Sequence, residues 1–127
     1  MMAAFDPRQP LVIVRAHIWG PANDAVVRLA LDTGATSTLI NETIIRYIGY
    51  DPSRGVRNVW ITTGSGLESA TVLRVSKIAA LGRRCRGFSL ICYSLPATTA
   101  VDGLLGLDFF RNRHLSIDFR SGHIRLR

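Results

Sequence analysis

The chain has little cysteine and no long hydrophobic run. Two cysteines in 127 residues are too few for the disulfide framework of a small secreted domain. The longest aliphatic run near the N-terminus, Leu11–Val14, ends at Arg15, so neither a signal peptide nor a membrane span is expected. Cys85 and Cys92 are seven residues apart, and on one regular strand an odd separation places side chains on opposite faces. We therefore expect free thiols and a cytoplasmic chain, or a soluble piece of a longer one.

Lysine is almost absent, since Lys77 is the only one, and the positive charge comes from arginine. With 16 basic and 9 acidic residues, the formal net charge is +7. Such a charge attracts nucleic acid and anionic lipid, but no compact basic run with interleaved aromatic residues occurs. We interpret the excess as a solvated surface and expect no nucleic-acid partner. An arginine-rich β-barrel that binds nucleic acid stays as an alternative.

Motifs for metals, phosphates and covalent catalysis are also missing. The three histidines show no ligand spacing with either cysteine, which argues against a zinc site. No phosphate-binding glycine loop is present, and no serine or cysteine sits in a nucleophile elbow. Accordingly, neither a metal nor an organic cofactor is expected.

The residues that are present indicate one globular domain, residues 1–127, because no linker, repeat or low-complexity tract divides them. Apolar residues make up 47% of the chain and mostly alternate with polar ones, which predicts strands. The predicted strands cover residues 11–19, 25–31, 56–63, 67–79, 84–95 and 102–106, and a hairpin over 115–126. Helical spacing appears over residues 38–48 and briefly after Gly106. The fold class is therefore all-β with one or two short helices.

One short motif carries chemistry. Asp32 ends an apolar strand and begins the sequence Asp32-Thr33-Gly34-Ala35. A carboxylate beside a core strand is costly unless it is hydrogen-bonded or shares a proton. Gly34 permits a tight turn that brings a backbone N–H near the carboxylate, and Thr33 adds a hydroxyl. A plain strand-ending turn is the simpler interpretation of this triplet taken alone.

A second motif lies about seventy residues downstream, where Leu104-Leu105-Gly106 leads into a short helix. Together, the two motifs and the order of the elements between them resemble the retropepsin-like aspartic proteases, over about residues 11–119. The resemblance implies a small closed β-barrel-like acid-protease fold that holds half an active site per chain. No second D-T-G or D-S-G occurs in this chain, so the resemblance implies a homodimer.

The resemblance also implies an aspartic endopeptidase. Asp32, Thr33 and Gly34 would form the catalytic loop, and two Asp32 carboxylates would share one proton and activate a water molecule. Thr33 would brace the two loops across the symmetry axis, and Leu104–Gly106 would support the loop from beneath. The alternative is a weak or inactive member that serves as a peptide-binding or dimerisation module.

The substrate of such an enzyme is a peptide or protein bound as an extended strand. The predicted substrate-binding residues belong to the loop (Ala35, Thr36) and to a glycine-rich hairpin tip that would act as a flap (Gly64, Ser65, Gly66). Two features depart from the family pattern: Thr36 and Ser37 follow the motif where many retroviral enzymes have Asp, and the chain ends at Arg127 without an apolar tail. Asp108 is interpreted as a helix-capping residue.

Overall fold

The computed structural model describes residues 2–127. Ten strands and two short α-helices make up most of it, with one 3₁₀ turn, η1 (Pro52–Arg54), before the flap. The strands are β1 (Met2–Ala4), β2 (Ile13–Trp19), β3 (Asp24–Leu31), β4 (Leu39–Asn41), β5 (Arg57–Thr63), β6 (Gly66–Ala80), β7 (Arg83–Tyr93), β8 (Gly103–Leu105), β9 (Leu115–Asp118) and β10 (His123–Leu126). The helices are α1 (Glu42–Tyr47) and α2 (Leu107–Phe110).

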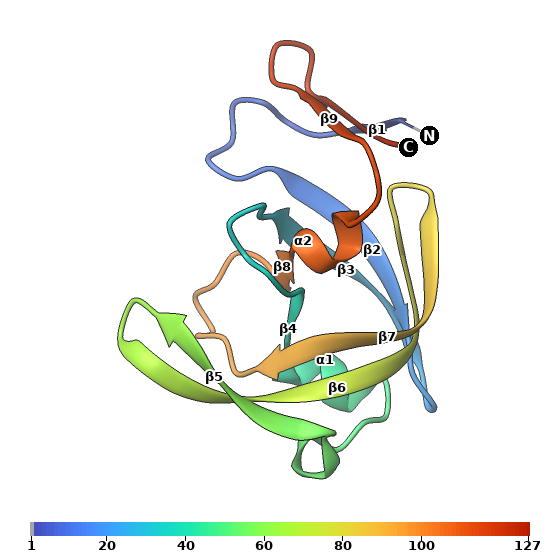
Figure 1. Ribbon diagram of the computed structural model, residues 1–127. Coiled ribbons are helices and arrows are strands. Elements are labelled where there is room, and N and C mark those ends of the chain that lie inside the picture. The colour runs from blue at the N-terminus through green and yellow to red at the C-terminus, as the bar shows by residue number, and fades with distance from the viewer. Residues whose placement is uncertain (1) are drawn as a thin grey trace.

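Six strands form a closed barrel. Their order is β2-β3-β8-β4-β7-β6, and β6 pairs back with β2 to complete the ring. The sheet continues past β6 to β5, which stands outside the ring as one arm of a long hairpin (Figure 1). The all-β class with two short helices is thus confirmed, as is the closed barrel.

The barrel interior is filled by alternate residues of these strands and by both helices. Val14, Ala16 and Ile18 of β2 are buried, while Arg15 is exposed, as the alternation in the sequence predicts. Ile45 of α1 and the Phe109 ring of α2 are fully buried, so each helix closes the barrel with one apolar face. Neither helix among residues 2–127 has the length and hydrophobicity needed to cross a membrane.

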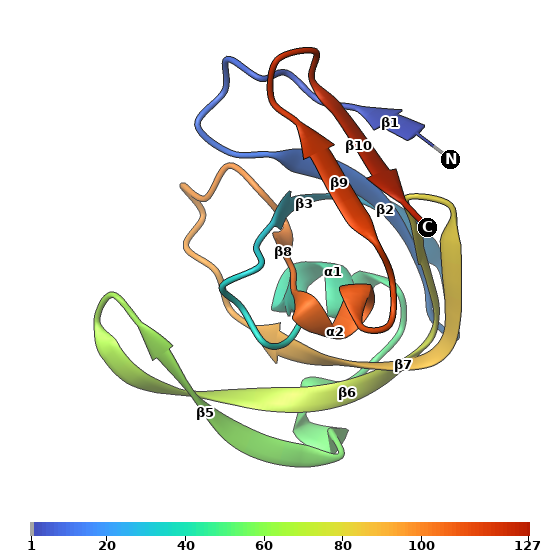
Figure 2. The same cartoon turned by 45° about the horizontal axis from the view of Figure 1, so that its top comes forward.

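The termini form a second, smaller sheet. Its order is β1-β10-β9, and it packs at one end of the barrel, as Figure 2 shows. The C-terminal hairpin is confirmed, but strand β1 is not among the predicted elements. Met2–Ala4 is too short to show alternation, and it becomes a strand because β10 offers it an edge, with Ala3 opposite Ile124.

The helix predicted over residues 38–48 is only half correct. Its first residues, Leu39–Asn41, form β4, and the helix begins at Glu42. β4 lies between β7 and β8 and pairs with both, so long-range pairing overrides the local helical spacing.

The prediction that Cys85 and Cys92 face opposite sides is wrong, although both thiols are free. Gly87 has a φ of +58°, and its pair with Ser76 is missing from the β6–β7 ladder, although the register is the same on both sides of it. The alternation of buried positions changes at this point: Leu73 and Val75 of β6 are buried before it, and Ile78 and Ala80 are buried after it. Cys92 is buried in the core, and Cys85 pairs with the fully buried Ile78 and packs against the same core.

Candidate active site

The D-T-G motif lies in the loop between β3 and β4, at the end of the barrel next to the flap. β3 runs parallel to β8, with Leu31 opposite Leu105. The Asp32 N–H continues this ladder by donating to the Leu105 carbonyl oxygen at 3.0 Å. Pairing between two strands that are far apart in sequence therefore fixes the position of Asp32 at the end of the barrel.

The Asp32 carboxylate is half-buried and has one hydrogen bond within the chain. Its Oδ1 accepts from the Gly34 N–H at 2.9 Å, and the Ala35 N–H donates to the Asp32 carbonyl oxygen at 3.2 Å. A side chain at position 34 would place its Cβ 3.1 Å from Oδ1, which explains the glycine there. The turn thus presents a carboxylate whose second oxygen is open to another group, and the exposed Thr33 lies beside it.

A buried polar cluster locks the loop from beneath. Thr38 is fully buried, and its N–H and Oγ1–H donate to the two oxygens of Asp108 at 2.8 and 2.7 Å. Its Oγ1 accepts in turn from the Gly106 N–H at 3.1 Å. The loop that carries Asp32 is therefore joined to the start of α2 by charge-assisted hydrogen bonds.

The interpretation of Asp108 as a helix-capping residue is wrong. Gly106 occupies the N-cap position of α2, and no side chain caps that position by a hydrogen bond. Asp108 lies inside the helix, and its carboxylate points to Thr38 because that residue offers two donors in an otherwise apolar site.

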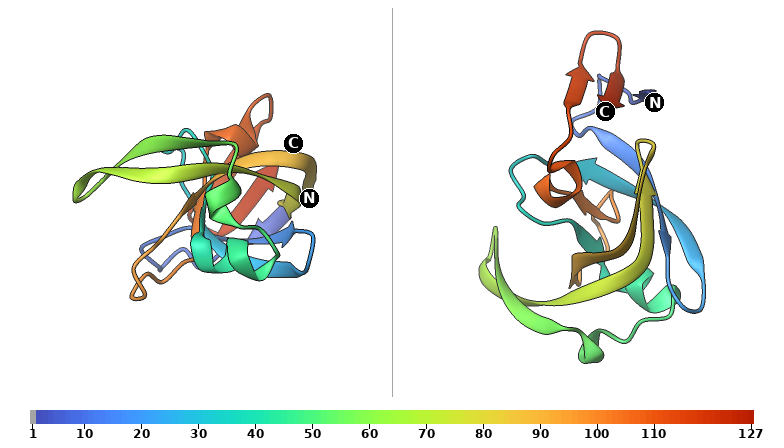
Figure 3. Two further views of the ribbon diagram at one scale, coloured as in Figure 1. Left: turned by 90° about the horizontal axis from the view of Figure 1, so that it is seen from below. Right: turned by 45° about the vertical axis from the view of Figure 1, so that its right-hand side comes forward.

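The second wall of the site is the flap, the hairpin of β5 and β6. Thr63 pairs with Gly66, which leaves Gly64 and Ser65 as a two-residue turn. Gly66 has a φ of +114°, so the turn needs a glycine there. Seen from below, the hairpin extends well away from the barrel (Figure 3).

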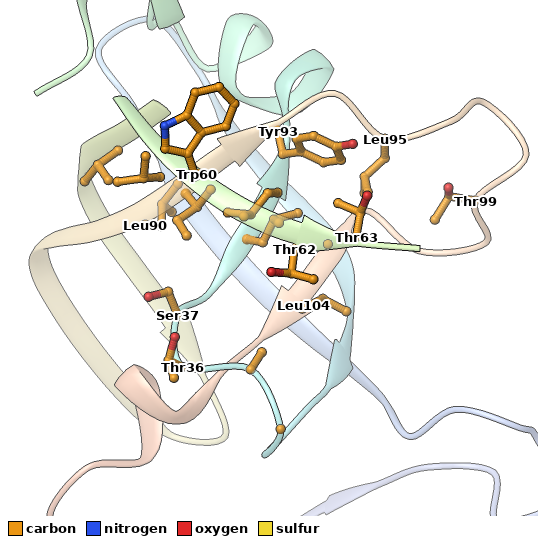
Figure 4. A pocket seen from close by; sticks show the side chains of 18 of the residues that line it. Thr36, Ser37, Trp60, Thr62, Thr63, Leu90, Tyr93, Leu95, Thr99 and Leu104 are labelled. Atoms are coloured by element: carbon orange, nitrogen blue, oxygen red, sulfur yellow. The ribbon is translucent and has the colours of Figure 1, made fainter. Parts of the chain in front are cut away.

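A cavity of about 800 Å³ lies between the flap and the loop. Figure 4 shows Thr36 and Ser37 of the loop on one side and Trp60 and Thr62 of β5 on the other. The floor and far end are mostly apolar and include Leu39, Leu90, Leu95, Pro96, Val101 and Leu104. Arg57 is the only charged residue that lines it.

The structure brings most of the predicted site residues together. Five of them line the cavity: Gly34, Ala35, Thr36, Gly64 and Ser65. Asp32 and Thr33 precede this lining on the same loop, and Gly66 lies at the flap tip without reaching the cavity. The loop over residues 95–101 and the Thr38–Asp108 cluster were not predicted. Only the position of Asp108, two residues after Leu-Leu-Gly, could have indicated the cluster.

Among residues 2–127, no three histidine, cysteine, aspartate or glutamate side chains are grouped so that they could hold a metal ion.

Comparison with known proteins agrees with this site. The family model described as aspartyl protease matches residues 15–109, which include the D-T-G loop, the flap and the Leu-Leu-Gly segment. Because this match covers well over half of the chain, the protein belongs to the aspartyl protease family.

The chain has the retropepsin fold. It is similar to the crystal structure of a retropepsin-like aspartic protease from Rickettsia conorii, with a TM-score of 0.72 and 16% sequence identity. The match covers 100% of this chain and 97% of the other. At this identity the likeness shows the fold. No curated protein matches the chain significantly.

Proposed function

We propose that the protein is an aspartic endopeptidase whose active site is completed by a second copy of the same chain. The observation that carries the proposal is the Asp32 loop: it holds one carboxylate with a free oxygen, and its next residues, Gly34–Ser37, line the cavity beneath the flap. A single chain supplies only one such carboxylate, because the sequence has one D-T-G motif. A two-fold axis next to Asp32 would place two of them side by side, with the exposed Thr33 bracing the paired loops.

Two adjacent carboxylates hold one proton between them. The ionised one would take a proton from a bound water molecule as its oxygen attacks the carbonyl carbon of the peptide bond, and the protonated one would donate to the carbonyl oxygen. The resulting diol then collapses: the C–N bond breaks, the amine nitrogen takes a proton from a carboxyl group, and a new carboxyl end forms. The Gly34 N–H would hold one carboxylate in position during both steps.

The cavity suits an extended polypeptide. Strand β5 pairs only with β6, so the backbone groups of its other edge are free to bind a substrate strand. Apolar side chains dominate the lining, and alternate substrate side chains would enter it. We therefore infer that apolar residues are preferred on both sides of the cleaved bond.

The first test replaces Asp32 by asparagine, which keeps the shape and removes the charge. With denatured casein as substrate and mass spectrometry of the products, the Asp32→Asn variant should lose all cleavage while its circular dichroism stays unchanged. Asp51→Asn is the matched control, because asparagine also caps a helical turn and Asp51 lies outside the cavity. Cleavage retained by purified Asp32→Asn would overturn the proposal.

The second test mixes the two proteins. If each site needs two chains, a nine-fold excess of Asp32→Asn should lower the activity of each wild-type chain about tenfold, since most wild-type chains then pair with an inactive copy. Unchanged activity would exclude a shared site. If casein stays intact while peptides still bind in the cavity, the chain is instead a peptide-binding module.

A further inference from the structure

The outer face of the barrel, on the side away from the flap, carries six of the 16 lysine and arginine residues of the chain. Alternation turns these side chains outward, because their neighbours Ala16, Val27, Val75 and Ile78 are buried. We call this surface the basic face; it is formed by β2, β3, β6 and β7 and consists of Arg15, Arg28, Arg74, Lys77, Arg84 and Arg86.

Like charges on this face stand directly opposite one another. Arg15 pairs with Arg28 across β2 and β3, and Lys77 pairs with Arg86 across β6 and β7. Directly opposed like charges destabilise a sheet. Two such pairs on one face are therefore unfavourable for the stability of the sheet.

No carboxylate of the described chain neutralises the basic face. The ion pairs within residues 2–127 involve other cations, and the one on this face joins Asp24 to His17 at 2.5 Å. Asp102 accepts from the backbone N–H of Arg28 at 2.8 Å, while the Arg28 guanidinium donates to the Ala100 carbonyl oxygen at 3.3 Å. Arg15 and Arg84 have no ion-pair partner within residues 2–127, so their guanidinium groups can bind an external anion.

The basic face is also hollowed. A shallow cavity of about 370 Å³ is lined by Arg15, His17, Val26 and Arg84, among others. Val26 is 63% exposed and supplies an apolar surface beside these polar side chains. Figure 1 shows β2 and the β6–β7 hairpin on the right of the barrel and the flap on the left, so this hollow is remote from the Asp32 site. An occupant with negative charge and an apolar group would suit it.

We propose that the basic face binds an acidic segment of a polypeptide, with its carboxylates on Arg15 and Arg84 and an apolar side chain on Val26. Single-stranded nucleic acid would need an aromatic ring free to stack on a base. The aromatic ring present, Trp19, is stacked on His17 at 3.7 Å and has the Lys77 amine 4.0 Å from its centre. The His17 ring and the Lys77 amine would collide if both lay on the same face of the Trp19 ring. They therefore cover its two opposite faces. The occupant inferred is therefore a polypeptide.

Binding can be measured without catalysis. The full chain carrying Asp32→Asn is titrated into a fluorescein-labelled peptide of ten glutamates and two leucines at low salt, and anisotropy is recorded. The double change Arg15→Glu and Arg84→Glu should raise the Kd by about tenfold or more. The matched control, Arg111→Glu with Arg113→Glu, makes the same change of charge at exposed residues after α2 and should raise it by less than about threefold.

Each other outcome overturns the proposal. If both double variants weakened peptide binding equally, the peptide would be attracted by the net charge of the protein alone. If the peptide did not bind at low salt, the basic face would not be a binding site. Tighter binding of a 12-nucleotide single-stranded DNA, lost in the same double variant, would make nucleic acid the occupant.

Folding is checked with Arg15→Glu alone: it removes a like-charge pair with Arg28, so the Tm should not fall. Should the double variant unfold, Arg15→Gln with Arg84→Gln takes its place. A failure of the Asp32 tests leaves this measurement unaffected.

Discussion

The two walls of the candidate active site are held in different ways. The Asp32 loop is tied to the barrel at three places. Asp32 donates to Leu105, the Leu107 N–H donates to the Ala35 carbonyl oxygen at 2.8 Å, and the fully buried Thr38 donates to Asp108. Each of these contacts joins segments about seventy residues apart, so the loop cannot move without opening the barrel.

The flap has no comparable attachment. β5 pairs only with β6, and the hydrogen bonds at its tip are local, between Thr63 and its neighbours Ser65 and Gly66. Its large apolar side chains remain in solvent, with Trp60 74% and Leu67 69% exposed. Few buried contacts are the physical basis of a low local stability.

The difference fits what an endopeptidase needs from each wall. A reacting carboxylate must be kept within a fraction of an ångström of its working position, which requires rigid support. A polypeptide, in contrast, can enter only if the other wall moves aside and returns to exclude water. Substitutions of equal size should therefore have unequal effects on the two walls.

The largest effect is expected from one added methyl group beneath the loop. In Gly106→Ala, the new Cβ would lie 2.7 Å from the Ser37 carbonyl carbon and 2.9 Å from the Ala35 oxygen, both of them backbone atoms. We expect a loss of about 3 kcal/mol in the free energy of unfolding, measured by urea denaturation, and the loss of casein cleavage.

The same substitution in the flap is the matched control. A Cβ on Gly64 would meet no atom within 4 Å, so Gly64→Ala should change the free energy of unfolding by less than about 0.5 kcal/mol. Equal destabilisation by the two alanines would contradict the contrast between the walls.

An intermediate effect is expected at Thr38. Thr38→Val keeps the shape but removes the hydroxyl, which leaves the buried Gly106 N–H without an acceptor and deprives Asp108 of a donor. A buried unsatisfied group of this kind costs about 2 kcal/mol. Urea denaturation gives the stability, and kcat against KM separates loop positioning from binding.

Two conservative variants make the Thr38 prediction specific. Thr38→Ser retains the hydroxyl and should restore most of the lost stability and rate. Asp108→Asn removes the charge but keeps one acceptor oxygen, so it should be milder than Thr38→Val. If Thr38→Ser were as damaging as Thr38→Val, packing of the methyl group would hold the loop as much as the hydrogen bonds of the hydroxyl do.

Much of the fold could be predicted from the sequence, because hydrophobic alternation marks the strands and characteristic residues mark the turns. Alternation in β2 and β6 identified the strands, and the Asp-Thr-Gly turn and the glycine-rich flap tip occur where predicted. The closed order of the barrel came from the family resemblance, since alternation alone does not say which strands are neighbours.

What could not be predicted depends on residues distant in sequence. β4 is a strand only because β7 and β8 flank it, and the interruption of the β6–β7 ladder at Gly87 becomes visible only opposite Ser76. Thr38 is a small polar residue in a loop, and nothing local distinguishes it from Thr36. Its burial follows from the approach of the Leu105–Asp108 segment, seventy residues later.

The smallest effect concerns the reactivity of two thiols, one in the barrel wall and one introduced at the flap tip. Cys92, on β7, is 4% exposed, and burial raises the pKa of its thiol to about 11, with a smaller contribution from nearby Glu42. Because only the thiolate reacts with iodoacetamide, Cys92 in the folded chain should stay unlabelled at pH 8. A thiol introduced by Ser65→Cys at the flap tip should react at the rate of a free peptide, as read residue by residue from mass spectrometry of the labelled protein.

The pH dependence follows from the same burial. Above about pH 9 the unfolded chain gives up the Cys92 proton, whereas the folded chain keeps it up to about pH 11, so the folded state loses stability as the pH rises through this interval. Cys92→Val has no thiol to titrate and should lose less stability between pH 8.5 and about 10.5, measured by urea denaturation of both proteins at each pH. Labelling of Cys92 at pH 8 as fast as that of the flap-tip thiol would show that the barrel wall opens as readily as the flap, and the contrast between a fixed and a mobile wall would then be wrong.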